Sequence, residues 1–193
     1  MKNIFLQNKT VEGILKPESD IESKLIRDPK FRQGLFWGKP RYGHPEGEII
    51  FHIEEVLKNI DRIETDSITR QQLRQVAFLH DTFKHIEDTN RPRDWSRHHS
   101  VLARKFAESY IDDELVLNII EHHDEAFYSW RSQFIFEQKQ DGEERMQKLL
   151  ENIKDHTQQF YLFFKCDTQT GDKNQRPLQW FEETVQNIQV VTL

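Results

Sequence analysis

The segment at residues 71–84, QQLRQVAFLHDTFK, holds the clearest helical pattern of the chain and its most distinctive polar pair. The apolar residues Leu73 and Val76 recur at the spacing of one face of an α-helix. His80 follows Val76 by four residues and Leu73 by seven, so it belongs to the same buried face. Asp81 comes directly after it. The pattern therefore predicts an imidazole and a carboxylate side by side at the end of an apolar helix.

Helical patterns extend on both sides of this segment. The periodicity of apolar residues predicts helices over 19–26, 45–63, 68–85, 98–110, 113–123, 142–167 and 178–188. Residues 31–47 contain four glycines and two prolines among aromatic side chains, which predicts an irregular, packed loop. No two alternating segments are joined by a hairpin turn, the usual signature of antiparallel strands. We therefore expect an all-α protein that folds as a compact helical bundle.

The composition supports a packed core under strongly solvated outer faces. Of 193 residues, 36% are hydrophobic and 31% are charged, and the hydrophobic share includes fourteen Phe and four Trp. Disordered chains lack this aromatic content, so the chain has enough bulky material to build a core. The length is that of one ordinary domain, and we expect residues 1–193 to form a single domain.

Several classes of function are disfavoured. No apolar run approaches the roughly 18–20 residues of a membrane span, so we expect no membrane partner. The formal net charge of −6 disfavours an extended nucleic-acid-binding surface. The single cysteine, Cys166, rules out an intrachain disulfide framework and favours a reducing compartment, so we expect a cytoplasmic protein. The composition is compatible with a homo-oligomer.

The histidines are the most informative residues outside segment 71–84. Further metal-competent side chains stand at the ends of apolar helices: His52, the pairs His98/His99 and His122/His123, and Asp167. In a bundle such helix ends can converge. A divalent metal that supports hydrolysis needs imidazole and carboxylate ligands and an open position for water. Its charge can dominate the local field, so a small phosphorylated substrate is compatible with a net charge of −6.

Five segments taken in order resemble the HD superfamily of metal-dependent phosphohydrolases. They are FHIEEVLKNID at 51–61, VAFLHDTFK at 76–84, RHHSVLARKFAE at 97–108, IIEHHDEAF at 119–127 and FFKCDTQTGDK at 163–173. The resemblance implies an HD-type helical bundle with its metal-site core at about 43–173. The N-terminal irregular segment and the C-terminal helix would pack on that core. The Gly-Tyr-Pro signature of the cyclic-di-GMP phosphodiesterase branch is missing after EHHDEAF, which argues against that substrate.

The same resemblance implies roles for individual residues. A first metal ion would be held by His52, His80, Asp81 and Asp167, and a second by one histidine of each pair. The family pattern fits His98 and His123 better than their neighbours. Asp81 and Lys84 would be catalytic, with Lys84 contacting phosphate. The family more often has a glycine at the position of Phe83, which is a departure from the pattern.

The expected activity is hydrolysis of a phosphate ester or anhydride in a small, nucleotide-like molecule through a metal-bound hydroxide. The ligand set suits one or two divalent ions and does not distinguish Mn, Fe, Mg, Zn, Ni and Co. Two other functions fit the same residues: a di-iron oxygenase of the HD type and a non-catalytic nucleotide-binding module.

Several residues have both a functional and a structural interpretation. Asp124 and Glu55 are candidate general bases or partners of the ligands, with ordinary salt bridges as the alternative. Lys173 and Arg176 are candidate phosphate contacts, with a solvated loop as the default interpretation, and Arg97 is an alternative to Lys84 for neutralising phosphate charge. Aromatic residues such as Phe127 and Trp130 either pack in the core or line a pocket that stacks a nucleobase.

Overall fold

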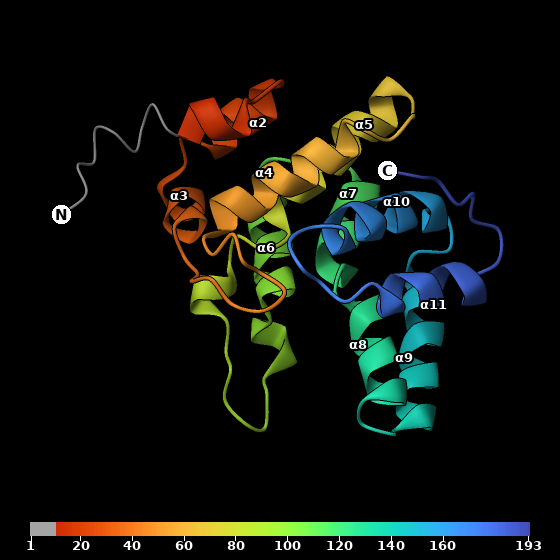
Figure 1. Cartoon of the computed structure of the whole chain (residues 1–193). Helices are drawn as coiled ribbons and strands as arrows, with labels where there is room; N and C mark the ends of the chain where they lie inside the picture. Colours follow the sequence, from red (N-terminus) through yellow and green to blue (C-terminus); the bar gives the residue numbers. More distant parts are fainter. Residues whose placement is uncertain (1–10) are drawn as a thin grey trace.

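The fold is built from helices throughout residues 11–193, the part of the chain that this computed structural model describes (Figure 1). Helical residues at 11–15 precede α2 (Asp20–Leu25), α3 (Pro29–Leu35), α4 (Ile49–Ile60), α5 (Ser67–Leu79), α6 (His99–Ala107), α7 (Glu114–His122), α8 (Glu125–Phe134), α9 (Lys139–Asn152), α10 (Thr157–Thr168) and α11 (Arg176–Thr184). Short 3-10 turns lie at Lys84–Ile86 and Trp95–Arg97. Within residues 11–193 the only β-type pairing is an isolated bridge between Arg41 and His44. The prediction of an all-α protein is confirmed.

Short polar side chains define where several helices begin. The side chains of Ser19, Asp28, Asp66 and Asp113 accept hydrogen bonds from backbone N–H groups in the first turns of α2, α3, α5 and α7. These N–H groups have no partner within the helix, so a capping oxygen stabilises the helix start by about 1 kcal/mol. At α3 the cap precedes Pro29, whose fixed backbone angle suits the first helical position.

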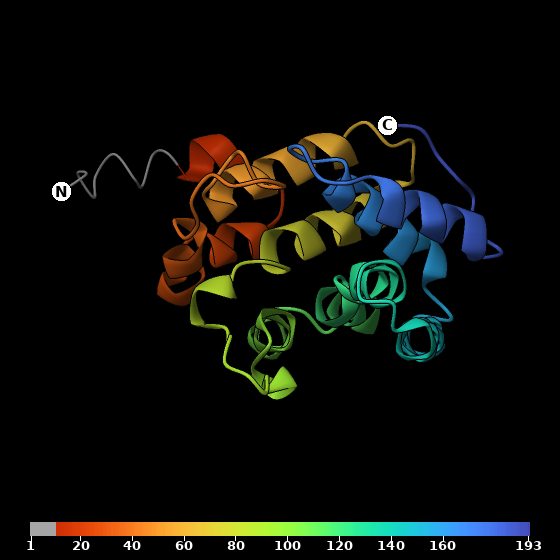
Figure 2. The same ribbon diagram turned by 60° about the horizontal axis from the view of Figure 1, so that its bottom comes forward.

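The helices pack around one hydrophobic core. Helix α10 contacts both α4 and α5, and α7 contacts both α5 and α6. Helices α8 and α9 run side by side, upright in Figure 1 and nearly end-on in Figure 2. The fully buried side chains Ile53, Phe78, Ile120 and Phe163 come from α4, α5, α7 and α10. This packing brings together helix ends that are far apart in the sequence.

Two of the predicted elements are wrong in the N-terminal half. The segment predicted as an irregular loop at 31–47 begins with α3, because Asp28 and Pro29 start a helix that continues through Gly34. The helix predicted over 68–85 ends at Leu79. The hydroxyl of Thr82 donates a hydrogen bond to Phe78 O at 2.7 Å, and such side-chain bonds to the backbone compete with helix continuation.

The long helix predicted over 142–167 is two helices joined by a turn at 153–156. Asn152, Asp155, His156 and Thr157 all have low helix propensity, and together they end α9 without a glycine or proline. Helix α8 lies between predicted elements and was missed. It begins directly after His123 and Asp124, so it continues the chain from the candidate site.

Candidate metal centre

Four of the predicted ligands converge on one point. Nε2 of His52 lies 3.2 Å from Nε2 of His80 and 2.9 Å from Oδ1 of Asp167. Oδ2 of Asp81 lies 3.6 Å from both imidazole nitrogens, and Asp167 Oδ1 lies 3.7 Å from His80 Nε2. Ligand atoms on a tetrahedron about 2.0–2.1 Å from a metal ion are about 3.3 Å apart. His52, His80 and Asp81 therefore fit the dimensions of one metal site, and Asp167 lies within ligand distance of both histidines; we call these four side chains site 1.

A second group of nitrogens faces the other oxygen of Asp81. Oδ1 of Asp81 lies 3.3 Å from Nε2 of His99 and 3.4 Å from Nε2 of His123, and these two nitrogens are 3.4 Å apart. Oδ2 of Asp124 is 3.3 Å from the same nitrogen of His99. We call this group site 2. Asp81 Oδ1 is buried and has no hydrogen-bond partner among the described residues, a costly arrangement that a bound cation would relieve.

Backbone carbonyls orient two of the histidines. Nδ1 of His80 lies 3.0 Å from Ala77 O, and Nδ1 of His123 lies 2.9 Å from Ile120 O. A carbonyl only accepts, so each Nδ1 carries the proton and donates it. In the neutral ring each Nε2 then has a lone pair directed at Asp81, as a metal ligand requires. Burial lowers the pKa of His123, but Asp124 and Asp81 outweigh it and raise the pKa to about 9, so a metal bound there would displace a proton.

Carboxylates orient the other two histidines. Nδ1 of His99 lies 2.9 Å from Oε2 of Glu87, and Nδ1 of His52 lies 3.4 Å from Oε1 of Glu46. Burial raises the pKa of Glu46, but hydrogen bonds from His52 and His44 outweigh it and lower the pKa to about 2, so this carboxylate is ionised. A carboxylate behind a histidine fixes its tautomer and makes it a stronger ligand. Sequence reasoning missed both glutamates, because neither lies near its histidine in a recognisable motif.

The structure places His99, and not His98, in site 2. His98 caps α6: its Nδ1 accepts a hydrogen bond of 3.3 Å from Ser100 N–H, so the proton is on Nε2, which lies 3.0 Å from the hydroxyl of Tyr128. A protonated Nε2 has no lone pair for a metal. His98 therefore stays outside the group that faces Asp81 and lies beside Glu87 and His99, whereas His123 belongs to site 2. The capping position of His98, just before a helix, was a signal for this assignment.

Two lysines neutralise the carboxylates of site 1. Nζ of Lys84 lies 2.5 Å from Oδ2 of Asp81, and Nζ of Lys173 lies 2.8 Å from Oδ1 of Asp167. Burial raises the pKa of Asp81, but Lys84 and His80 outweigh it and hold the pKa well below its usual value. Burial likewise raises the pKa of Asp167, and Lys173 and His52 lower it further than burial raises it. Both aspartates are therefore ionised, as ligands need to be.

Of the remaining candidates, only some reach the site. Asp124 lies at site 2, as described above, whereas the carboxylate of Glu55 accepts a hydrogen bond of 3.0 Å from Gly171 N–H and holds a loop. Lys173 lies at site 1, but Arg97 and Arg176 are not among the lining residues of the adjacent pocket.

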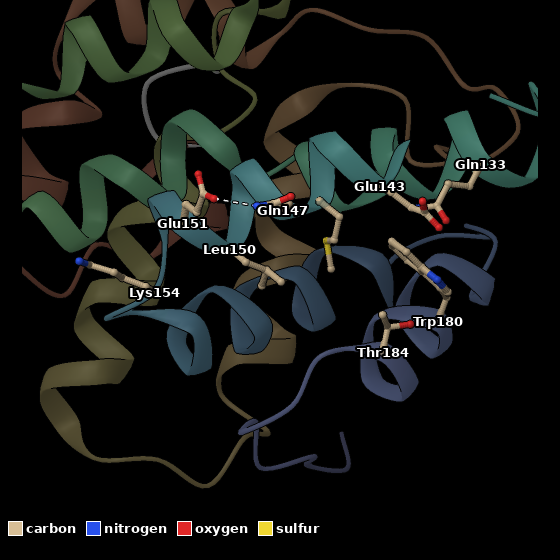
Figure 3. A pocket seen from close by; sticks show the side chains of 9 residues that line it. Gln133, Glu143, Gln147, Leu150, Glu151, Lys154, Trp180 and Thr184 are labelled. Atoms are coloured by element: carbon tan, nitrogen blue, oxygen red, sulfur yellow. Dashed lines mark hydrogen bonds between the residues drawn. The ribbon is translucent and has the colours of Figure 1, made fainter. Parts of the chain in front are cut away.

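Of two hollows on the described part of the molecule that we compare, one contains the metal-competent residues. The larger, about 680 Å³, lies against α9 and α11 and is lined by Leu150, Trp180 and mostly polar side chains (Figure 3). It contains no residue of site 1 or site 2. The smaller, about 370 Å³, is lined by members of both sites and by aromatic side chains. We call it the central pocket. Its lining residues are Tyr42, Gly43, His44, Asp81, Lys84, His123, Asp124, Phe127, Trp130, Arg131, Ile135, Phe164, Asp167, Thr168, Lys173, Asn174 and Pro177.

The comparisons with known proteins add no relative. No protein-family model matches the chain, and no match is found among curated proteins or solved structures. Across residues 11–193, no helix combines the length and the apolar character needed to cross a membrane. The structure itself shows buried histidine side chains and Asp81 within metal-ligand distance of one another; they come from α4, from α6 and from the turns that follow α5 and α7.

Proposed function

We propose that this chain is a metal-dependent phosphohydrolase of the HD type that cleaves a phosphate ester or anhydride of a small molecule. The observation that carries the proposal is the position of Asp81. Its two carboxylate oxygens face two separate groups of histidine nitrogens, each turned towards it by a partner on the far side of the ring. This arrangement is suited to one carboxylate bridging two divalent ions.

The roles of the side chains follow from their positions. His52, His80, Asp81 and Asp167 would hold one ion, and Asp81 would share a second with two further histidines, His99 and His123. A divalent ion held by these residues would supply a water of lowered pKa, towards ~7, and a positive charge for a phosphoryl oxygen. Lys84 lines the central pocket beside Asp81 and would neutralise phosphate charge in the transition state.

Charge in the central pocket favours an anionic substrate. Its lining includes three carboxylates, Asp81, Asp124 and Asp167, and three cations, Lys84, Arg131 and Lys173. These charges balance, so each divalent ion added makes the pocket positive although the chain as a whole is negative. The volume of about 370 Å³ is at the small end of the ~300–1,000 Å³ range of small-molecule sites.

The test begins with elemental analysis of the freshly purified protein, followed by phosphate release from a nucleotide panel and from phenyl phosphate with the metal found. The double variant His80→Ala, Asp81→Ala should abolish release, and the near-isosteric Asp167→Asn should reduce it strongly while leaving the circular dichroism spectrum unchanged. Glu55→Gln, whose carboxylate binds a loop, is the control and should retain activity.

Activity that survives the double change would refute the assignment of the site. Bound iron with a di-iron electron paramagnetic resonance signal and no phosphate release would instead favour an oxygenase. Failure to retain any metal at micromolar concentration would favour a non-catalytic module.

A further inference from the structure

Arg131 differs from the other cations of the central pocket. Lys84 and Lys173 are each paired with a carboxylate of site 1. Arg131 lines the same pocket but forms no ion pair and no side-chain hydrogen bond with any residue in the range 11–193. Its Nε is buried without an acceptor. The side chain is half-buried, so its other N–H groups can reach water or a ligand, whereas the unpaired buried Nε–H costs free energy.

Aromatic rings hold this guanidinium in place. Its central carbon Cζ lies 4.7 Å from the ring centre of Tyr128, 5.3 Å from that of Phe136 and 5.4 Å from that of Phe127. Such contacts attract the positive charge and restrict its motion, but they provide no strong acceptor for its N–H groups. The result is a preorganised planar donor group in the wall of the pocket, the type of group that binds carboxylate and phosphate with two parallel hydrogen bonds.

Helix α8 sets the distance between Arg131 and the metal centre. Asp124 of site 2 is the residue that precedes α8, and Arg131 follows it by seven residues, or two turns. Phe127 stands between them on the same face, and all three line the central pocket. Seven residues rise by about 10 Å, and helical side chains incline towards the N-terminus, so one small molecule can reach both Arg131 and the metal centre.

We propose that the substrate carries a second anionic group besides its scissile phosphate, and that Arg131 binds this group across an aromatic ring lying on Phe127 and Trp130. The inference rests on the proposed function, because it takes the central pocket as the substrate site. It narrows the substrate class to aromatic phosphates with an additional carboxylate or phosphate. The competing interpretation is that Arg131 only supports the loop after α8 through its contact with Phe136.

Binding of two matched phosphonates separates these interpretations without requiring hydrolysis. Phenylphosphonate and 4-phosphonobenzoate differ by one carboxylate. A third probe, 3-phosphonobenzoate, places this carboxylate at another position on the ring. The Kd of each probe is measured by calorimetry on the metal-loaded protein. Wild-type protein should bind a carboxylated probe at least about tenfold more tightly than phenylphosphonate. Arg131→Met should remove this preference and leave the Kd of phenylphosphonate unchanged, and Arg131→Lys should retain part of it.

Arg145→Met is the matched control. Arg145 also lies over the ring of Tyr128, at 5.0 Å, but it pairs with Glu125 and does not line the central pocket. This variant should keep the full preference for the carboxylated probe. Thermal unfolding of each variant shows whether the loss of an arginine also loosens the fold.

Three results would overturn the inference: equal binding of all probes by the wild type, a preference that persists in Arg131→Met, or its equal loss in Arg145→Met. Phosphate release from the nucleotide panel and from phenyl phosphate tests the proposed function separately. A preference that depends on Arg131 together with no phosphate release would leave this anion site standing and refute the hydrolase.

Discussion

Gly34 occupies the contact between α3 and the turn that carries His80 and Asp81. A methyl group added there by Gly34→Ala would lie 1.8 Å from Thr82 O and 2.8 Å from Thr82 C, both backbone atoms. Real Cβ atoms do not approach other heavy atoms closer than 3.0 Å, so α3 and the turn must separate by roughly 1 Å. We expect this substitution to destabilise the fold and to displace Asp81 at the same time.

Two opposing contributions determine the size of the effect. Overpacking of a closely packed contact costs about 1–3 kcal/mol, and the backbone atoms involved here place it at the upper end. Replacing glycine by alanine within a helix returns about 0.5–1 kcal/mol. The net loss is about 2 kcal/mol, which for a chain of this size lowers Tm by about 4–8 °C. A displacement of about 1 Å at a catalytic group can cost ~100-fold in activity.

Gly13→Ala is the matched control. Gly13 lies in the helical stretch 11–15, and a Cβ built there meets nothing within 4 Å. The Gly13→Ala substitution should raise the free energy of unfolding by about 0.5–1 kcal/mol, because alanine restricts the unfolded chain more than glycine does. Urea unfolding and thermal unfolding followed by circular dichroism measure both variants, and elemental analysis measures their bound metal. Equal stability of Gly34→Ala and wild type, or destabilisation by Gly13→Ala, would refute this reasoning.

Three further predictions concern the metal centre. His99→Ala should remove the ion of site 2. His98→Ala should leave the metal content unchanged and lower the free energy of unfolding by about 1 kcal/mol, because a helix cap is lost. Elemental analysis and Tm distinguish the two variants, and the reverse result would restore His98 as the ligand. Glu87→Gln should weaken metal binding about 10–100-fold, because His99 loses the carboxylate that orients it. Titration with a competing chelator measures the Kd of the metal, and an unchanged Kd would contradict the role of Glu87. Removing the metal with a chelator should lower Tm, and readdition should raise it again, with the logarithm of the free metal concentration once this exceeds Kd; a Tm independent of metal would mean that Asp81 is not a ligand.

The helical architecture was largely predictable from the sequence, because the signals for a helix come from residues that are close together in the chain. Apolar periodicity placed most helices near their observed positions, and Ser19, Asp28, Asp66 and Asp113 are ordinary capping residues. The errors fell where the local signal is weak. The turn at 153–156 has no glycine or proline, and α8 carries aromatic residues on more than one face, so no single stripe marks it. Such boundaries depend on which helix packs against which.

The candidate metal centre was also predictable only in part. The order His52, His80–Asp81 and Asp167 along apolar helices was enough to predict a shared site, because few other arrangements explain buried polar groups at helix ends. Adjacent residues point about 100° apart on a helix, so the choice between His98 and His99 depends on how α6 is rotated against its neighbours.

Residue type, spacing and periodicity were therefore sufficient for the helical class, and the resemblance to the HD superfamily named the four side chains that the fold brings together at site 1. Long-range packing alone assigned His99 to site 2, placed Glu46 and Glu87 behind their histidines, and brought Arg131 into the central pocket. The physical reason is range. Helical periodicity and helix capping depend on residues a few positions apart, whereas a metal or anion site requires atoms from distant helices to meet within about 4 Å.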